Sequence, residues 1–82
     1  MTSIYFVEVT DTFGGEANYC WARRYRVNAA SQRGAISKIS RHEGLHFRNT
    51  GNRYDASNAC VCAFIDDWDD NNHSDYTYVK TI

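Results

Sequence analysis

The first part of the chain alternates apolar and polar positions in two stretches separated by a pair of glycines. Ile4–Thr10 is rich in β-branched and aromatic residues, and Tyr19–Val27 alternates with a period of two. Both patterns are typical of β-strands. Gly14 and Gly15 predict a turn between them, because glycine adopts positive φ angles without strain. We therefore expect these two stretches to pair as an antiparallel hairpin.

A helical pattern follows the second stretch. Ala35, Ile36 and Ile39 form a narrow apolar stripe at helical spacing, and Ser31 suits the position that caps a helix N-terminus. Gly44 predicts the end of the helix, because a left-handed glycine commonly follows the last turn. The pattern therefore predicts a helix between Ser31 and Gly44 that packs its stripe on the sheet.

Shorter apolar stretches after the helix predict further strands. Leu45–Arg48 and Arg53–Tyr54 flank a turn of small polar residues. Ala59–Ile65 is almost entirely apolar, which favours a central strand with neighbours on both sides. Tyr76–Ile82 predicts the last strand, after an acidic loop over Asp66–Asp75.

These elements predict an α+β fold in the order ββαβββ. An antiparallel sheet of four to five strands would carry one helix packed on a face. At 82 residues the chain is expected to form a single domain, residues 1–82. No apolar run approaches the roughly 18 residues of a membrane-spanning helix, and no signal peptide is recognisable. Three cysteines without a suitable pair favour reduced thiols, and hence a cytoplasmic protein.

Charge adds a feature that the near-neutral total conceals. Eight of the nine lysines and arginines lie between Arg23 and Arg53, where the only acid is Glu43. Six of the ten acids follow Arg53. Segregated charge of this kind steers association and selects partners. The chain therefore combines a basic middle with an acidic end.

Two charged groups are candidate contacts with a partner. The basic group lies on the second strand and the helix, and comprises Arg23, Arg24, Arg26, Arg33, Lys38 and Arg41. The acidic group comprises Asp66, Asp67, Asp69 and Asp70. Basic side chains beside Trp21 and Tyr25 suit phosphate contact and base stacking, whereas the aspartates suit a basic groove on a protein. The alternative is that the arginines only solvate the sheet or pair with aspartates, and that the aspartates form a solubilising loop.

Two short motifs resemble metal sites. His42-Glu43-Gly44-Leu45-His46 has the letters of the zinc-binding helix of metallopeptidases, but the expected helix end at Gly44 removes His46 from the face of His42. Asp67, Asp69, Asn71 and Asp75 partly match a calcium-binding EF-hand loop, but Tyr78 replaces the bidentate glutamate. We expect no zinc site, and a solvated turn or weak calcium binding in the acidic loop.

No catalytic constellation is recognisable elsewhere. The chain has no nucleophile elbow, no glycine-rich phosphate loop and no C-x-x-C pair. Cys20 and Cys62 are expected to be small core residues under the helix. We therefore expect no metal, no cofactor and no enzymatic activity.

The anatomy of the chain resembles that of small phage-encoded anti-defence proteins, particularly inhibitors of type I CRISPR complexes. The resemblance is carried by the strand-to-helix junction Arg26–Ser31, the helix through Ile39, and the return into a strand at Gly44-Leu45. It implies a non-catalytic protein that binds a host defence complex and occludes the path of guide or target nucleic acid. The alternative is a small nucleic-acid-binding regulator that places its arginine-rich strand and helix on the phosphates.

Overall fold

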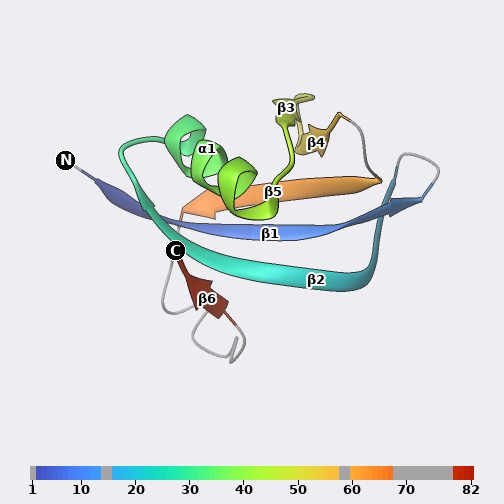
Figure 1. Cartoon of the computed structure of the whole chain (residues 1–82), viewed down its shortest axis with the longest axis horizontal. Coiled ribbons are helices and arrows are strands. Elements are labelled where there is room, and N and C mark those ends of the chain that lie inside the picture. Colours follow the sequence, from blue (N-terminus) through green and yellow to red (C-terminus); the bar gives the residue numbers. More distant parts are fainter. Residues whose placement is uncertain (1, 14–15, 58–59, 68–78) are drawn as a thin grey trace.

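The computed structural model describes residues 2–13, 16–57, 60–67 and 79–82. One sheet of six strands runs in the order β3-β4-β5-β1-β2-β6, and the helix lies against one of its faces (Figure 1). Among the described residues no helix is both long and apolar enough to cross a membrane. In chain order the elements are β1 (Ser3–Phe13), β2 (Glu16–Ala29), α1 (Gln32–Glu43), β3 (Phe47–Asn49), β4 (Tyr54–Ala56), β5 (Val61–Asp67) and β6 (Val79–Thr81).

The expected ββαβββ order with four to five antiparallel strands is wrong. The described elements follow ββαββββ, and the sheet is mixed, because β6 pairs with β2 in parallel. Both β5 and β2 run antiparallel to β1, so they run parallel to one another. Residues 68–78 then connect β5 to β6 on the far side of β2. A side-chain period of two marks a strand but carries no information about its neighbours or direction.

The predicted hairpin of β1 and β2 is confirmed, and it is longer than expected. The pairing shifts register between Thr10 and Thr12, where β2 contributes extra residues. The Asp11 carboxylate lies in this irregularity and accepts hydrogen bonds from the backbone N–H of Cys20 and from Asn18 Nδ2, both at 3.1 Å. These bonds satisfy donors that the ladder leaves unpaired. The hairpin therefore continues through polar residues that give no apolar alternation.

The main core lies between α1 and the face of the sheet that it covers. Val7, Val9 and Val27 of the hairpin are fully buried, as is Ile39 of α1. The helix contributes only three buried side chains, and the narrow stripe predicted from the sequence comprises the same three: Ala35, Ile36 and Ile39. At roughly 25 cal/mol for each Å² of apolar surface removed from water, this contact is the main attachment of α1.

A second, smaller buried cluster lies on the opposite face of the sheet. Thr10 and Cys62 pair across β1 and β5 and are both fully buried. The Thr10 hydroxyl donates a hydrogen bond of 2.6 Å to the carbonyl oxygen of Trp21. Cys62 therefore lies on the face away from the helix, and Cys20 is exposed, so the prediction that both pack under the helix is wrong. Strand alternation decides this, because Cys62 lies between Val61 and Ala63, which face α1.

Both predicted ends of α1 are confirmed. Ser31 is the N-cap, and its hydroxyl accepts a hydrogen bond of 3.1 Å from the backbone N–H of Gly34. At the other end Gly44 takes a left-handed conformation with φ of 69°, and Leu45 donates to the carbonyl oxygen of Ser40 at 3.1 Å. The helix therefore ends one residue after Glu43, which fixes where that side chain meets the sheet.

The Ser31→Ala variant should lower the free energy of unfolding by about 1 kcal/mol, because it removes the acceptor for a helix N–H that has no intrahelical partner. Urea unfolding followed by far-UV circular dichroism measures the change. Ser37→Ala, at an exposed position of the same helix, is the matched control and should stay within about 0.5 kcal/mol of the wild type. Equal stability of Ser31→Ala and the control would contradict the cap.

Candidate functional site

The ten charged residues predicted as contacts do not form one surface. Arg23 points to the α1 side of the sheet, whereas Arg24 and Arg26 point to the opposite side and are half-buried. The helix residues Arg33, Lys38 and Arg41 are exposed. Of the acidic group, Asp66 is exposed at the end of β5. The side chain of Asp67 and all of Asp69 and Asp70 lie outside the described residues, as does the partial EF-hand pattern.

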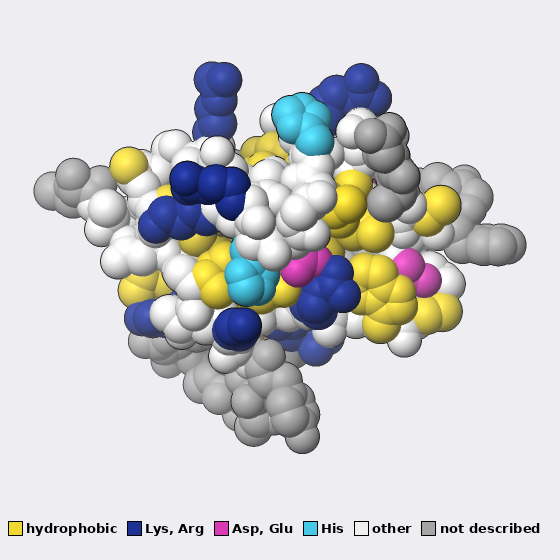
Figure 2. All heavy atoms as spheres, in the orientation of Figure 1, with side chains coloured by type: hydrophobic (Ala, Val, Ile, Leu, Met, Phe, Trp, Pro, Cys, Tyr) yellow, Lys and Arg dark blue, Asp and Glu magenta, His cyan; other side chains and the backbone are white. Residues whose placement is uncertain are grey.

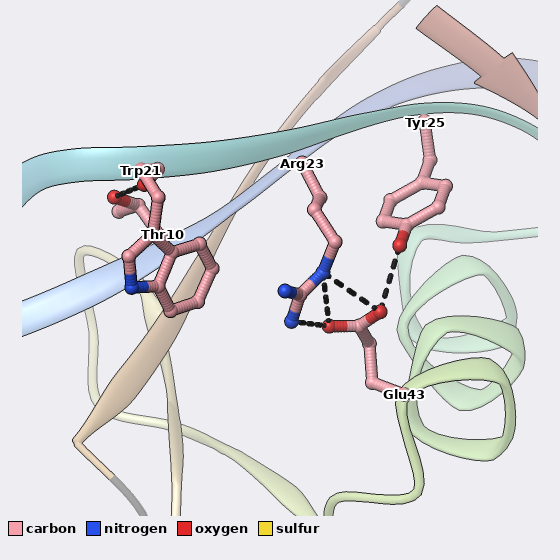
Figure 3. Close-up of polar contacts among 5 residues, drawn as sticks. All are labelled: Thr10, Trp21, Arg23, Tyr25 and Glu43. Atoms are coloured by element: carbon pink, nitrogen blue, oxygen red, sulfur yellow. Dashed lines mark hydrogen bonds and ion pairs between the residues drawn. The ribbon is translucent and has the colours of Figure 1, made fainter.

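Arg23 is held against the end of α1 by Glu43, the only acid of the basic stretch (Figure 3). Its Nε lies 2.9 Å from one carboxylate oxygen and 3.2 Å from the other, and its Nη2 also contacts the carboxylate. Tyr25 adds a third partner, since its hydroxyl donates to Glu43 at 2.7 Å. The Glu43 side chain is 6% exposed and that of Arg23 is 49% exposed. Glu43 therefore joins the helix to β2.

The protonation of this cluster follows from its hydrogen bonds. Burial alone would raise the pKa of Glu43, but the hydrogen bonds from Arg23 and Tyr25 stabilise the carboxylate and bring its pKa below the usual value. Burial and the hydrogen bond to Glu43 raise the pKa of Tyr25 to about 12. At neutral pH the cluster is therefore a carboxylate that accepts from a guanidinium and a protonated phenol.

Aromatic rings complete the surroundings of Arg23. Its guanidinium carbon lies 4.5 Å from the centroid of the Trp21 ring, a cation–π contact. The Tyr25 ring meets His42 edge-on at 5.1 Å and is buried. On the other face of the sheet, Arg24 Nε pairs with Glu8 at 2.9 Å. The arginines of β2 therefore pair with glutamates, whereas the sequence alternative named aspartates as their partners.

The exposed cations of α1 remain as a continuous basic surface. We call the outward side of the helix with Arg33, Lys38 and Arg41 the basic helix face. Its only acid, Glu43, turns toward the sheet. Lys38 donates one hydrogen bond to the carbonyl oxygen of Asn28, and within the described part of the chain neither Arg33 nor Arg41 forms an ion pair. Figure 2 shows dark-blue side chains over and around α1.

A groove borders this face where α1 approaches β3 and β4. Its volume is about 410 Å³. Three polar side chains of α1 line one wall, and two from the following segment line the other; they are Arg33, Ser37 and Ser40, then His46 and Asn49. Ile36, Phe47 and Tyr54 supply apolar lining, and none of the lining residues is acidic. The groove therefore offers a cation and several hydrogen-bonding groups beside an apolar surface.

Sequence reasoning missed both Glu43 as an organising residue and this groove. A single acid among eight basic residues was a usable signal for Glu43, because a lone opposite charge is a natural partner for its neighbours. Ser37 and Ser40 follow Arg33 at helical spacing, but nothing in the sequence places β3 and β4 beside them. The groove depends on that tertiary contact.

The sequence candidates for metal binding do not assemble. Gly44 ends the helix between His42 and His46, so the two histidines do not share a helix face, as expected. Glu43, the residue that would activate water in a metallopeptidase, is bound to Arg23 and Tyr25. No group of three potential metal ligands occurs among the described residues.

No protein-family model matches this chain, and no curated protein or solved structure shows significant similarity to it. The functional argument therefore depends on the geometry of the chain itself.

Proposed function

We propose that this chain is a non-catalytic binding protein that blocks a nucleic-acid-handling complex of host defence, such as a CRISPR effector, in the host cytoplasm. The basic helix face contacts phosphates of the strand that the complex holds. One observation carries the proposal: Arg33, Lys38 and Arg41 are exposed together on one helix, and its only acid points away from them. Grouped cations without intervening acids suit a phosphate backbone.

The geometry favours the helix over the arginine-rich strand as the contact. Arg23 and Arg24 lie on opposite faces of the sheet and are each paired with a glutamate. Tyr25 is only 3% exposed, so its ring is not available for stacking. A regulator that lays β2 on free nucleic acid would have to break these ion pairs, which makes it the less supported alternative.

A matched pair of double variants tests the proposal. Arg33→Gln/Arg41→Gln removes two charges from the basic helix face, and Arg48→Gln/Lys80→Gln removes two exposed charges from β3 and β6. Binding to a guide-loaded type I CRISPR effector and to naked single-stranded RNA is measured by fluorescence anisotropy over a salt series. Each lost phosphate contact on a single strand lowers the salt slope by about 0.7, so the helix variant should lose about 1.4 and the control nearly nothing.

The partner separates the two functions. Binding to the loaded effector, weakened in the helix variant alone, supports the inhibitor. Binding to naked RNA without binding to the effector supports the regulator instead. Equal slopes for both double variants, or no binding to either probe, would overturn the assignment of the basic helix face.

A further inference from the structure

The groove beside α1 has the dimensions of a ligand site. Its volume of about 410 Å³ lies within the range of roughly 300–1,000 Å³ that is usual for small-molecule sites. Arg33 lies both on the basic helix face and on the groove wall. A strand whose phosphates follow the helix therefore passes the mouth of the groove.

The polar lining selects a ligand that is anionic or rich in acceptors. The Arg33 guanidinium carries five N–H donors, and the Ser37 and Ser40 hydroxyls can each donate as well. Asn49 Oδ1 already accepts the backbone N–H of Gly51 at 2.8 Å, which leaves its amide Nδ2 as a donor for a ligand. No carboxylate lines the groove to compete with such a ligand.

The apolar lining favours a flat ligand. Tyr54 and Asn49 are directly paired across β3 and β4, so their side chains lie side by side on the same face of the sheet. Tyr54 is half-buried and Phe47 is buried against the core, which leaves the tyrosine ring as the accessible aromatic surface. A planar ring laid on Tyr54 would present its edge to the Asn49 amide.

We propose that the groove binds one unstacked base of a single-stranded nucleic acid, with the base on Tyr54, its edge at Asn49 and the adjoining phosphate at Arg33. This inference rests on the proposed function and narrows its ligand from any phosphate backbone to a single strand. Bases in a duplex are stacked on their neighbours and do not reach such a groove, whereas the bases of single strands stack on protein aromatic rings.

The test compares two fluorescent oligomers with equal charge, a short oligodeoxyadenylate and an oligomer of the same length made of abasic sites. The wild type should bind the adenylate about tenfold more tightly, the usual contribution of one stacked base. Tyr54→Leu should abolish this preference, whereas Tyr54→Phe, which keeps the ring, should retain it. Circular dichroism establishes that each variant is folded.

A second measurement on the wild type keeps the inference testable if Tyr54→Leu fails to fold. Backbone amide NMR shifts of Ser37 and Asn49 should move with the adenylate and much less with the abasic oligomer. Equal affinity for both oligomers, with shifts confined to Lys38 and Arg41, would overturn the base site and leave the proposed function standing. Binding to neither oligomer would overturn the base site, while the effector assay decides the proposed function separately.

Discussion

Replacing Ile39 by alanine should lower the free energy of unfolding by about 3–4 kcal/mol, because it opens a cavity at a fully buried position between α1 and the sheet. An 82-residue domain has a total stability of about 4–12 kcal/mol. One side chain therefore accounts for a large share of it. The helix has only two other buried side chains, Ala35 and Ile36, and neither is placed to fill the cavity.

Urea unfolding followed by circular dichroism measures the effect of Ile39→Ala. The midpoint should fall while the denaturant slope stays constant, since the variant changes stability and not the surface exposed on unfolding. Arg41→Ala, an exposed position on the same helix, is the control and should change stability by less than about 0.5 kcal/mol. A loss below about 1 kcal/mol for Ile39→Ala would mean that α1 is not docked as described.

Replacing Glu43 by glutamine should lower the free energy of unfolding at pH 7 by about 2 kcal/mol, because it weakens two hydrogen bonds to a charged acceptor. This figure is well below the cost of breaking a fully buried ion pair, since Arg23 is 49% exposed and solvent screens the charge. The loss is nevertheless larger than that expected for the N-cap, because Glu43 joins α1 to β2.

The same variant should change the response to acid. The folded-state pKa of Glu43 lies below the ordinary value of 4.5, so the unfolded chain takes up the proton first as the pH falls. The stabilisation is therefore complete above about pH 4.5 and is lost as the pH falls through the folded-state pKa. Wild-type stability should drop over that window, and Glu43→Gln should drop less.

Thermal unfolding of both proteins between about pH 2 and pH 7 checks this expectation. Glu16→Gln removes an exposed carboxylate from β2 and is the control, which should follow the wild-type curve. Parallel acid curves for the wild type and Glu43→Gln would show that the carboxylate contributes no stabilisation through Arg23 and Tyr25.

The local elements were predictable because their signals are local. Ser31 and Gly44 mark the two ends of α1 through the hydrogen bonds and φ angle of a few neighbouring residues. The pairing of β1 with β2 follows from alternation and a short connection. The polar ends of these strands escaped prediction, since the irregularity closed by Asp11 removes the alternation on which the expectation depended.

The assembly of the sheet was not predictable on the same grounds. The parallel pairing of β6 with β2 is a contact between segments more than fifty residues apart, and no pattern within either strand reports it. The groove beside α1 likewise needs β3 and β4 to approach the helix. Both features depend on long-range packing, to which residue periodicity is blind.

The sequence by itself determined the helix, its caps, its apolar stripe, the first hairpin and the clustering of basic residues in the middle of the chain. Only the tertiary structure decided which of those basic residues remain available. Strand alternation sends Arg23 and Arg24 to opposite faces, where Glu43 and Glu8 pair with them. The outer side of α1 faces no acid, because a helix packs only one stripe on the sheet and leaves the opposite side in solvent. Charge density is thus written along the chain, whereas its accessibility is a property of the fold.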